Sequence, residues 1–220
     1  MKQIAPNVYK LSGIPPNAIN IYLAGDVLID AGTRIARARI LRQTADRPLS
    51  LLALTHAHPD HQGAAKAVCE ARNIPLACHA DDVDAIEGRR PIQEASPQHP
   101  VNRIIAKIWT GPDCTVDRVL NDGDAVGDFT VIHAPGHQRG SVIFFRESDR
   151  VAICGDVIRN VNFFTGLPKL AEPPDIFTLD KAQNRSSIRR LAELHPSVVC
   201  PGHGPPLRDP DKLKAFAAAL

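Results

Sequence analysis

The sequence lacks the long apolar runs that direct a chain into or across a membrane. No apolar run approaches eighteen residues, and the start of the chain at Met1 does not combine a basic stretch, an apolar core and a small-residue cleavage site. These absences argue against a transmembrane helix and a secretory signal. We therefore expect a cytoplasmic protein that does not associate with a membrane.

The sequence also lacks an excess of charge of either sign. The formal net charge is +2, and acidic and basic residues are scattered along the chain. A protein that binds nucleic acid usually carries a concentrated basic surface, for which there is no sign here. We expect a small molecule as the partner, no nucleic acid, and leave a homodimer open.

Paired cysteines are missing as well. The five cysteines are odd in number and none forms a C-x-x-C pair, which is typical of buried thiols in a reducing compartment. With 220 residues, of which 44% are hydrophobic and 23% charged, the chain can bury a substantial core. We predict one domain over residues 1–220.

What the sequence does have is a dense cluster of metal-binding residue types. Residues 55–61 read Thr-His-Ala-His-Pro-Asp-His, between an apolar run of strand length at 49–54 and an alanine-rich helical stretch at 62–72. A loop between a strand and a helix is a common place for catalytic residues, because the scaffold on either side is rigid. The cluster is therefore the first candidate for a functional site.

The spacing within this cluster suggests how it could hold metal ions. Residues two apart on an extended chain point to the same side, so His56 and His58 can bind one ion. Pro59 favours a turn after His58, which puts Asp60 and His61 on another side, where a second ion could bind. Imidazoles with a carboxylate favour Zn, with Fe, Mn or Co as alternatives. The plainer interpretation is a solvated helix start capped by Asp60, but capping explains one residue of the four.

Three more ligand-type residues follow predicted strands in the second half of the chain. His137 stands in Pro-Gly-His after the strand at 129–132, Asp156 in Cys-Gly-Asp after 151–153, and His203 in Pro-Gly-His-Gly after 198–200. Singly, each is weak evidence. Together with residues 55–61 they indicate one constellation.

Hydrophobic patterning predicts strands and helices in alternation, and hence a sheet covered by helices. An antiparallel meander is expected first, followed by strands and helices through residue 87 and a second strand-rich part from residue 116. The predicted strands are 8–11, 18–24, 27–30, 49–54, 74–78, 119–120, 129–133, 142–146, 151–154 and 198–200, and the predicted helices are 34–45, 62–72, 80–87 and 179–194.

In these motifs the sequence resembles the metallo-β-lactamase superfamily of metal-dependent hydrolases. The resemblance includes Ile-Asp-Ala-Gly at 29–32 and spans nearly the whole chain. It implies an α/β fold, the αβ/βα four-layer sandwich, with two mixed sheets face to face, helices outside and the metals at one edge. It also implies His56, His58 and His137 on a first metal, Asp60, His61 and His203 on a second, Asp156 bridging both, and Asp30 as support for a ligand.

Such a site predicts hydrolysis. Two cations can share a water and turn it into hydroxide near neutral pH, which attacks a carbonyl carbon while a metal polarises the oxygen. Asp60 could orient that hydroxide and pass a proton to the leaving group. We expect two divalent ions, most simply Zn with Fe or Mn as alternatives, and a small ester, thioester, lactone or β-lactam as substrate.

Other functions stay open at this stage. The resemblance also covers iron-dependent oxidoreductases of the persulfide dioxygenase type and phosphodiesterases, and a catalytically silent binding protein is the remaining alternative. Two segments are candidates for the substrate pocket. Residues 89–113, with Trp109, read as a long connection without helices or strands and as a mobile lid. Residues 161–174 offer Phe163 and Phe164 as an apolar wall, with Arg159 nearby to meet a carboxylate; the alternative is that these aromatic residues only pack.

Overall fold

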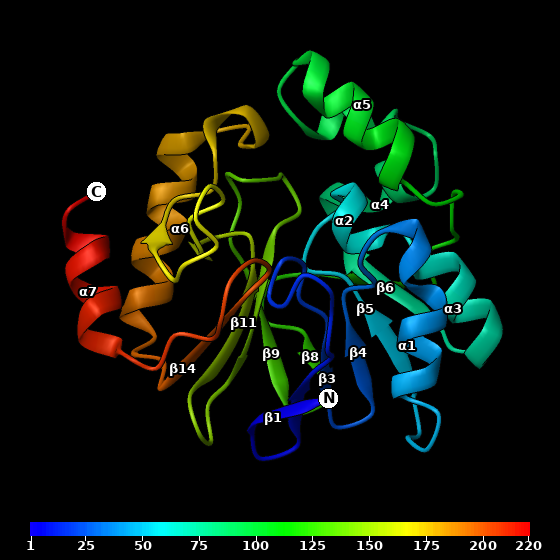
Figure 1. Cartoon of the computed structure of the whole chain (residues 1–220), viewed down its shortest axis with the longest axis horizontal. Coiled ribbons are helices and arrows are strands. Elements are labelled where there is room, and N and C mark those ends of the chain that lie inside the picture. The colour runs from blue at the N-terminus through cyan, green and yellow to red at the C-terminus, as the bar shows by residue number, and fades with distance from the viewer.

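The protein consists of two β-sheets packed face to face between helices (Figure 1). The computed structural model describes residues 1–220, apart from the side chains of Gln93 and Ala95. The two sheets meet along the middle of the molecule, and helices cover the outer face of each (Figure 1).

The first sheet has seven strands in sequence order. Its first four strands form an antiparallel meander, of which β2 to β4 were predicted and β1 was not, and β4 to β7 then pair in parallel. The strands are β1 (Lys2–Ala5), β2 (Val8–Lys10), β3 (Tyr22–Ala24), β4 (Val27–Ile29), β5 (Leu51–Ala53), β6 (Leu76–His79) and β7 (Arg118–Leu120).

The second sheet has five strands in the order β14-β11-β10-β9-β8. Only β11 and β14 are parallel neighbours, so this sheet is mixed too. Its strands are β8 (Ala125–Val126), β9 (Phe129–His133), β10 (Val142–Arg146), β11 (Val151–Gly155) and β14 (Val198–Pro201), and a small hairpin, β12 (Arg159–Asn160) with β13 (Leu170–Ala171), stands apart.

Helices complete the four layers. α1, α3 and α4 lie on the first sheet, and α6 and α7 lie on the second (Figure 1). The α-helices are α1 (Arg37–Gln43), α2 (Pro59–Gln62), α3 (Ala65–Arg72), α4 (Val83–Ile86), α5 (Pro100–Trp109), α6 (Lys181–Glu193) and α7 (Pro210–Ala218), with 3₁₀ turns η1 (Arg34–Ala36), η2 (Ala80–Asp82), η3 (Ile92–Ala95) and η4 (Asp175–Phe177).

The core follows the same layers. One apolar cluster fills the space between the sheets, with Tyr22 and Phe144 among its fully buried members. A second cluster joins the first sheet to its helices, and a third joins the second sheet to α6 and α7. The central strands of both sheets therefore bury both faces, which explains why they read as continuous apolar runs and not as alternating ones.

The prediction for residues 89–113 was wrong in one respect. The segment is not free of helices, because it contains η3 and the ten-residue helix α5, which stands above the upper ends of the sheets (Figure 1). His99 caps α5 by accepting a hydrogen bond from the Val101 N–H at 3.2 Å, and Pro100 opens the helix. α5 buries only two residues, Asn102 and Ala106, and it leaves Ile104 and Ile108 exposed.

Two further predictions need correction. The helix expected over 62–72 is split into α2 and α3 around Gly63, where an added Cβ would lie 2.4 Å from the Trp109 carbonyl oxygen. Helix α7 was not predicted at all, although Asp209 caps it by accepting from the Lys212 N–H and Pro210 follows.

The five cysteines form no disulfide in the described structure, and four of them are buried. This confirms the prediction of mostly buried thiols. Among the described residues, none of the helices combines the length and the apolar character that crossing a bilayer requires.

Candidate metal centre

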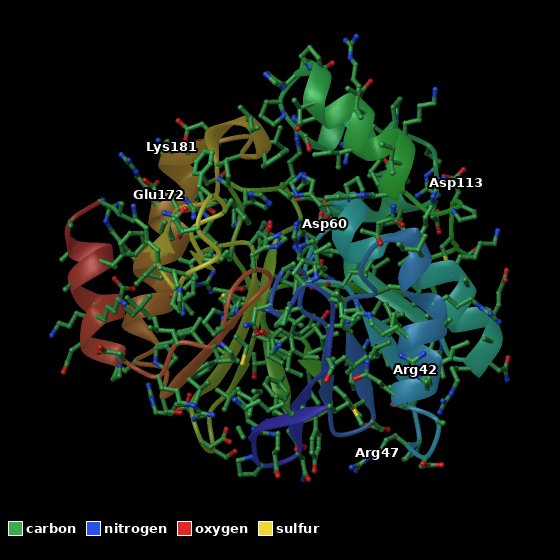
Figure 2. The ribbon with its side chains drawn as sticks, in the orientation of Figure 1. Arg42, Arg47, Asp60, Asp113, Glu172 and Lys181 are labelled. Carbon is green, nitrogen blue, oxygen red and sulfur yellow. The ribbon has the colours of Figure 1, made fainter. Side chains whose placement is uncertain are left out.

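The candidate site lies where β5 ends and α2 begins. His56 and His58 follow β5 in extended backbone, and Pro59 is the first residue of α2. No side chain caps this helix; the carboxylate of Asp60 instead lies 3.2 Å from Nε2 of His203. The capping interpretation of Asp60 is therefore not what the structure has. Figure 2 shows Asp60 between the two halves of the molecule, near the upper ends of the sheets.

Three buried imidazoles form the first part of the site. Nδ1 of His58 lies 3.0 Å from Nε2 of His56 and 2.8 Å from Nε2 of His137. Their other ring nitrogens face hydroxyl groups: His56 that of Thr55 at 3.0 Å, His58 that of Ser96 at 2.7 Å, and His137 that of Thr178 at 3.4 Å. We call these three residues the imidazole group.

The donor atoms of the imidazole group fit a metal ion. The Thr178 hydroxyl donates to the Pro174 carbonyl oxygen, so His137 Nδ1 is the donor in their contact and His137 Nε2 carries the lone pair. Thr55 similarly hydrogen-bonds the Asp30 carboxylate, which leaves His56 Nε2 as the lone-pair atom. Ligands of a tetrahedral zinc lie about 3.3 Å apart. In this group the nitrogens of His58 and of the other two imidazoles lie only 2.8–3.0 Å apart. Two lone pairs that close repel each other, so a cation or a shared proton must lie between the nitrogens.

Two carboxylates and two imidazoles form the second part of the site. Nε2 of His203 lies 3.1 Å from Asp156 and 3.2 Å from Asp60, and Nε2 of His61 lies 3.5 Å from Asp156. Nε2 of His61 and Oδ1 of Asp156 are buried without a hydrogen-bond partner. We call Asp60, His61 and His203 the mixed group.

Asp156 lies between the two groups. Its Oδ2 is 3.6 Å from His137 Nε2 and 3.1 Å from His203 Nε2. The seven predicted ligands are thus brought together, and the ligand atoms of the imidazole group and of the mixed group each lie within 4.8 Å of one another. His56, His61 and Asp156 form a third such set.

Asp30 and Thr55 orient the imidazoles from behind. Oδ2 of Asp30 accepts from His61 Nδ1 at 2.8 Å, so the proton of this imidazole is on Nδ1 and Nε2 faces the site. Oδ1 of Asp30 accepts from the Thr55 N–H at 2.8 Å. Asp30 adopts a φ of 64°, in the left-handed region that Asp tolerates better than most residues. The expectation that Asp30 supports a ligand matches this geometry.

Burial keeps the imidazole group neutral. It lowers the pKa of His56 and His58 well below the usual value of His, and the neighbouring imidazoles lower it further. Burial also lowers the pKa of His137, to about 4. At neutral pH these three rings carry lone pairs and no net charge.

The mixed group has the opposite electrostatics. Burial alone would lower the pKa of His203 and His61, but Asp156 and the other carboxylates outweigh it, and the pKa of His203 rises to about 10. Burial alone would likewise raise the pKa of Asp60 and Asp156, but His61 and His203 hold both well below the usual value. Without a cation, the mixed group is therefore a set of internal ion pairs.

The glycines of the second-half motifs make room for the ligands. A Cβ on Gly202 would lie 2.1 Å from Oδ1 of Asp156 and 2.6 Å from Cε1 of His61. Only glycine fits this position beside the site. The sequence motif Pro-Gly-His-Gly therefore carries a packing requirement as well as a ligand candidate.

Asp82, which the sequence did not single out, ties two ligand loops together. Its buried carboxylate accepts from the N–H of Ala57, between His56 and His58, at 2.9 Å and from the N–H of Gly140 at 3.2 Å. Burial raises the pKa of Asp82 to about 7. A buried acid that accepts from two backbone N–H groups leaves no periodic pattern in a sequence, so the sequence does not predict this role of Asp82.

A cavity of about 860 Å³ opens onto both groups. Its lining includes Asp60, His137, Asp156 and His203 from the site. Ligand pockets of proteins span about 300–1,000 Å³, so this cavity can hold a substrate of moderate size.

Three of the four predicted pocket residues line this cavity: Trp109, Phe163 and Arg159. The ring of Phe163 stands 5.6 Å from that of His203, edge to face. Arg159 stacks on Phe163 at 5.0 Å and donates to the carbonyl oxygens of Glu172 and Val161, so much of its guanidinium is already used. Phe164 is fully exposed and does not line the cavity, because its side chain lies in solvent.

Comparison with known proteins identifies the family. The profile of the metallo-beta-lactamase superfamily matches residues 14–203, most of the chain and all seven candidate ligands. The chain belongs to the metallo-β-lactamase superfamily. One similar protein is the probable metallo-hydrolase YflN of Bacillus subtilis strain 168, which is 28% identical over 82% of this chain and 76% of its own length.

Two other similar proteins bear on chemistry and fold. The acyl-coenzyme A thioesterase MBLAC2 of Gallus gallus is 31% identical over 69% of this chain and 62% of its own length. The crystal structure of TTHA1623 in a di-iron-bound form is 28% identical, has a TM-score of 0.65 and covers 97% of this chain and 96% of that one. The predicted superfamily, the four-layer fold and the metal-dependent hydrolase class are confirmed.

Proposed function

We propose that this protein hydrolyses the acyl C–O, C–S or C–N bond of a small ester, thioester, lactone or β-lactam at two metal ions held by the seven candidate ligands. The observation that carries the proposal is the pair of donor groups, the imidazole group and the mixed group, which face one cavity with Asp156 between them. The thioesterase activity in the name of one relative supports an acyl substrate.

Bound metals would lower the pKa of a shared water and polarise the carbonyl oxygen of the substrate. Asp60 stands at the cavity with a carboxylate that stays ionised, so its oxygens can accept a hydrogen bond from the attacking water and orient it. After bond cleavage the same carboxylate can carry that proton to the leaving group. Phe163, beside His203, covers part of this region with an apolar ring and limits the access of other water.

Metal content and turnover test the proposal together. We expect about two metals per chain, Zn being the first candidate, and hydrolysis of at least one substrate in a panel of thioesters, lactones, aryl esters, phosphodiesters and a chromogenic cephalosporin. A chelator should abolish turnover and added Zn should restore it. Turnover that survives complete metal removal would contradict the proposal, and cleavage of phosphodiesters alone would replace it.

A second candidate function is iron-dependent oxidation. His56, His61 and Asp156 form a group of two imidazoles and one carboxylate, the ligand set that non-haem iron oxygenases use. One structural relative binds two irons. One iron per chain, together with oxygen uptake in the presence of a persulfide, would favour this function over hydrolysis.

A further inference from the structure

The segment before and within α1 is strongly basic. Arg34, Arg37, Arg39 and Arg42 lie in it, and no acidic residue occurs from Ala31 to Ala45. None of the ion pairs among the described residues involves these four arginines. A run of like charge without acidic partners near a binding site suits an anionic ligand.

Two of the four arginines line the cavity of the metal centre, Arg39 and Arg42, while Arg34 and Arg37 do not. Arg39 is partly buried and donates from Nη1 to the Ser12 carbonyl oxygen at 2.8 Å, which holds its guanidinium in place. Burial lowers the pKa of Arg39, and the charge of Arg42 lowers it further. An anion beside both would relieve this repulsion.

The spacing of the pair favours phosphates. Residues three apart on a helix have Cβ atoms about 5–6 Å apart, so two guanidinium groups can span neighbouring phosphate groups. A single carboxylate would occupy one of them. In Figure 2, Arg42 on α1 is well separated from Asp60, so a group that it binds belongs to an extended molecule and not to the reacting carbonyl itself.

The rest of the cavity is suited to an acyl chain. Ile105 and Trp109 from α5, Phe163 and Phe177 line it, and Ile35 at its edge is 83% exposed. Apolar side chains on this scale favour a hydrocarbon chain over a polar substrate. The cavity thus combines a metal centre, an apolar wall and two arginines, Arg39 and Arg42, that have no acidic partner.

We propose that Arg39 and Arg42 bind the phosphates of a phosphorylated thiol leaving group, so that the substrate is an apolar acyl thioester of the coenzyme A type. The inference rests on the proposed hydrolytic function. In the reaction the acyl C–S bond breaks, a C–O bond forms to the oxygen of water, and one water proton goes to the departing sulfur. The products are a carboxylic acid and the free phosphorylated thiol.

The test compares two thioesters with one acyl chain of about eight to twelve carbons. One carries coenzyme A, and the other carries N-acetylcysteamine, which has the same reacting bond and no phosphate. For the metal-loaded wild type we expect a higher kcat/KM on the coenzyme A ester, falling with added salt. The double variant Arg39→Gln/Arg42→Gln should lose about 10- to 100-fold on that ester, mainly through KM, and change little on the other.

Arg37→Gln is the matched control. It removes the same charge from the same helix at a residue that does not line the cavity, so its kcat/KM should stay near wild type on both esters. Equal losses of the double variant on both esters, or an equal loss in Arg37→Gln, would overturn the proposed phosphate site. The single variant Arg42→Gln should fold like the wild type, because Arg42 is exposed and makes no hydrogen bond among the described residues. A loss of kcat/KM on the coenzyme A ester in this variant therefore does not come from misfolding.

A binding measurement separates this inference from the proposed function. Desulfo-coenzyme A keeps the phosphates and lacks the thiol that could bind a metal. Its titration by calorimetry should show binding to the wild type and to Arg37→Gln, with at least about tenfold weaker binding to the double variant. Hydrolysis of lactones or aryl esters without any binding of desulfo-coenzyme A would overturn the phosphate site and leave the hydrolase standing. Binding of desulfo-coenzyme A without hydrolysis of any substrate would keep the phosphate site and overturn the proposed hydrolase.

Discussion

The two halves of the metal centre use similar residues in opposite electrostatic states. The imidazole group is buried and neutral, with three nitrogen lone pairs aimed at one point and no carboxylate among its members. In the mixed group two imidazoles of raised pKa pair with Asp60, and with Asp156 between the groups, and the pKa of both carboxylates is lowered. In the imidazole group a cation relieves the repulsion between the lone pairs. In the mixed group a cation can bind only after the ion pairs between its imidazoles and carboxylates are broken. The same residue type can thus be made to bind a metal with or without releasing a proton.

The largest effect is expected from removing a ligand of each group. His137→Ala should lower turnover at least about a thousand-fold and leave at most about one metal per chain, because it opens the imidazole group. His203→Ala should also lower turnover, but it should keep a metal in the intact imidazole group. Metal analysis by mass spectrometry, beside kcat/KM, checks both. If His203→Ala lost both metals, or His137→Ala kept both, the two groups would not be separate sites.

Metal binding should reveal the different protonation of the two groups. In the metal-free protein His203, with a pKa of about 10, holds a proton at pH 7, and His137, with a pKa of about 4, does not. Filling the mixed group should therefore release about one to two protons, from His203 and His61, and weaken as the pH falls, whereas filling the imidazole group should release none. Calorimetric zinc titrations in buffers of different ionisation enthalpy count these protons. Heats that do not depend on the buffer would contradict the prediction.

A smaller loss of metal affinity should follow Asp30→Asn. Asp30 contacts the mixed group through Nδ1 of His61, on the side of the imidazole away from the metal site. The variant removes the carboxylate that accepts from His61 Nδ1 and from Thr55, so it loosens one imidazole without removing a ligand. We expect about 10- to 100-fold weaker binding at the mixed group and little change at the imidazole group. Competition with a chromogenic chelator measures both constants. Equal weakening at both groups would show a general loss of fold instead.

The smallest effect on the site is expected from Asp82→Asn, since Asn can still accept one of the two backbone hydrogen bonds. The variant should instead change how the free energy of unfolding depends on pH. The pKa of Asp82 is about 7 in the folded protein and about 3.8 unfolded, so its contribution to the free energy of unfolding is fully present below about pH 3.8 and is lost as the pH rises to 7. Wild type should therefore lose stability relative to the variant over this window.

Asp149→Asn provides a control of opposite sign for that experiment. Asp149 pairs with Arg146, which lowers its pKa, so its contribution is present above the unfolded pKa and is lost as the pH falls. Urea titrations of the three proteins between about pH 2 and pH 8 compare the trends, because the change for Asp149 falls below about pH 3.8 and that for Asp82 above it. A stability difference for Asp82→Asn that does not change with pH would contradict the raised pKa.

The sequence predicted more about the ligands than about their surroundings. The seven candidate ligands could be found because they stand in short motifs directly after apolar strands, and both signals are local. Trp109 could be proposed for the pocket because it lies in a long connection between the ligand motifs, and Phe163 because it closely follows Asp156. Asp82, Ser96 and the arginine pair of α1 could not, because nothing near them in the sequence indicates that they face the site.

Local pattern also explains the errors in the fold. The sequence predicts an irregular connection where α5 lies, because prolines dominate its surroundings. It also predicts one continuous helix across the break between α2 and α3, because Gly63 lies within an alanine-rich stretch. That break depends on the close approach of the Trp109 carbonyl oxygen, which comes from 46 residues further along the chain. Tertiary contacts of this kind override helix propensity.

By itself, the sequence determined the residue types of the site, the strands before them and the superfamily, because ligand chemistry and hydrophobic period are properties of neighbouring residues. Only the tertiary structure decided which imidazoles are neutral, which are charged, and which distant side chains share their cavity. The pKa of a buried group depends on its burial and on the charges a few ångströms away, and packing brings those charges from strands and loops far apart in the sequence.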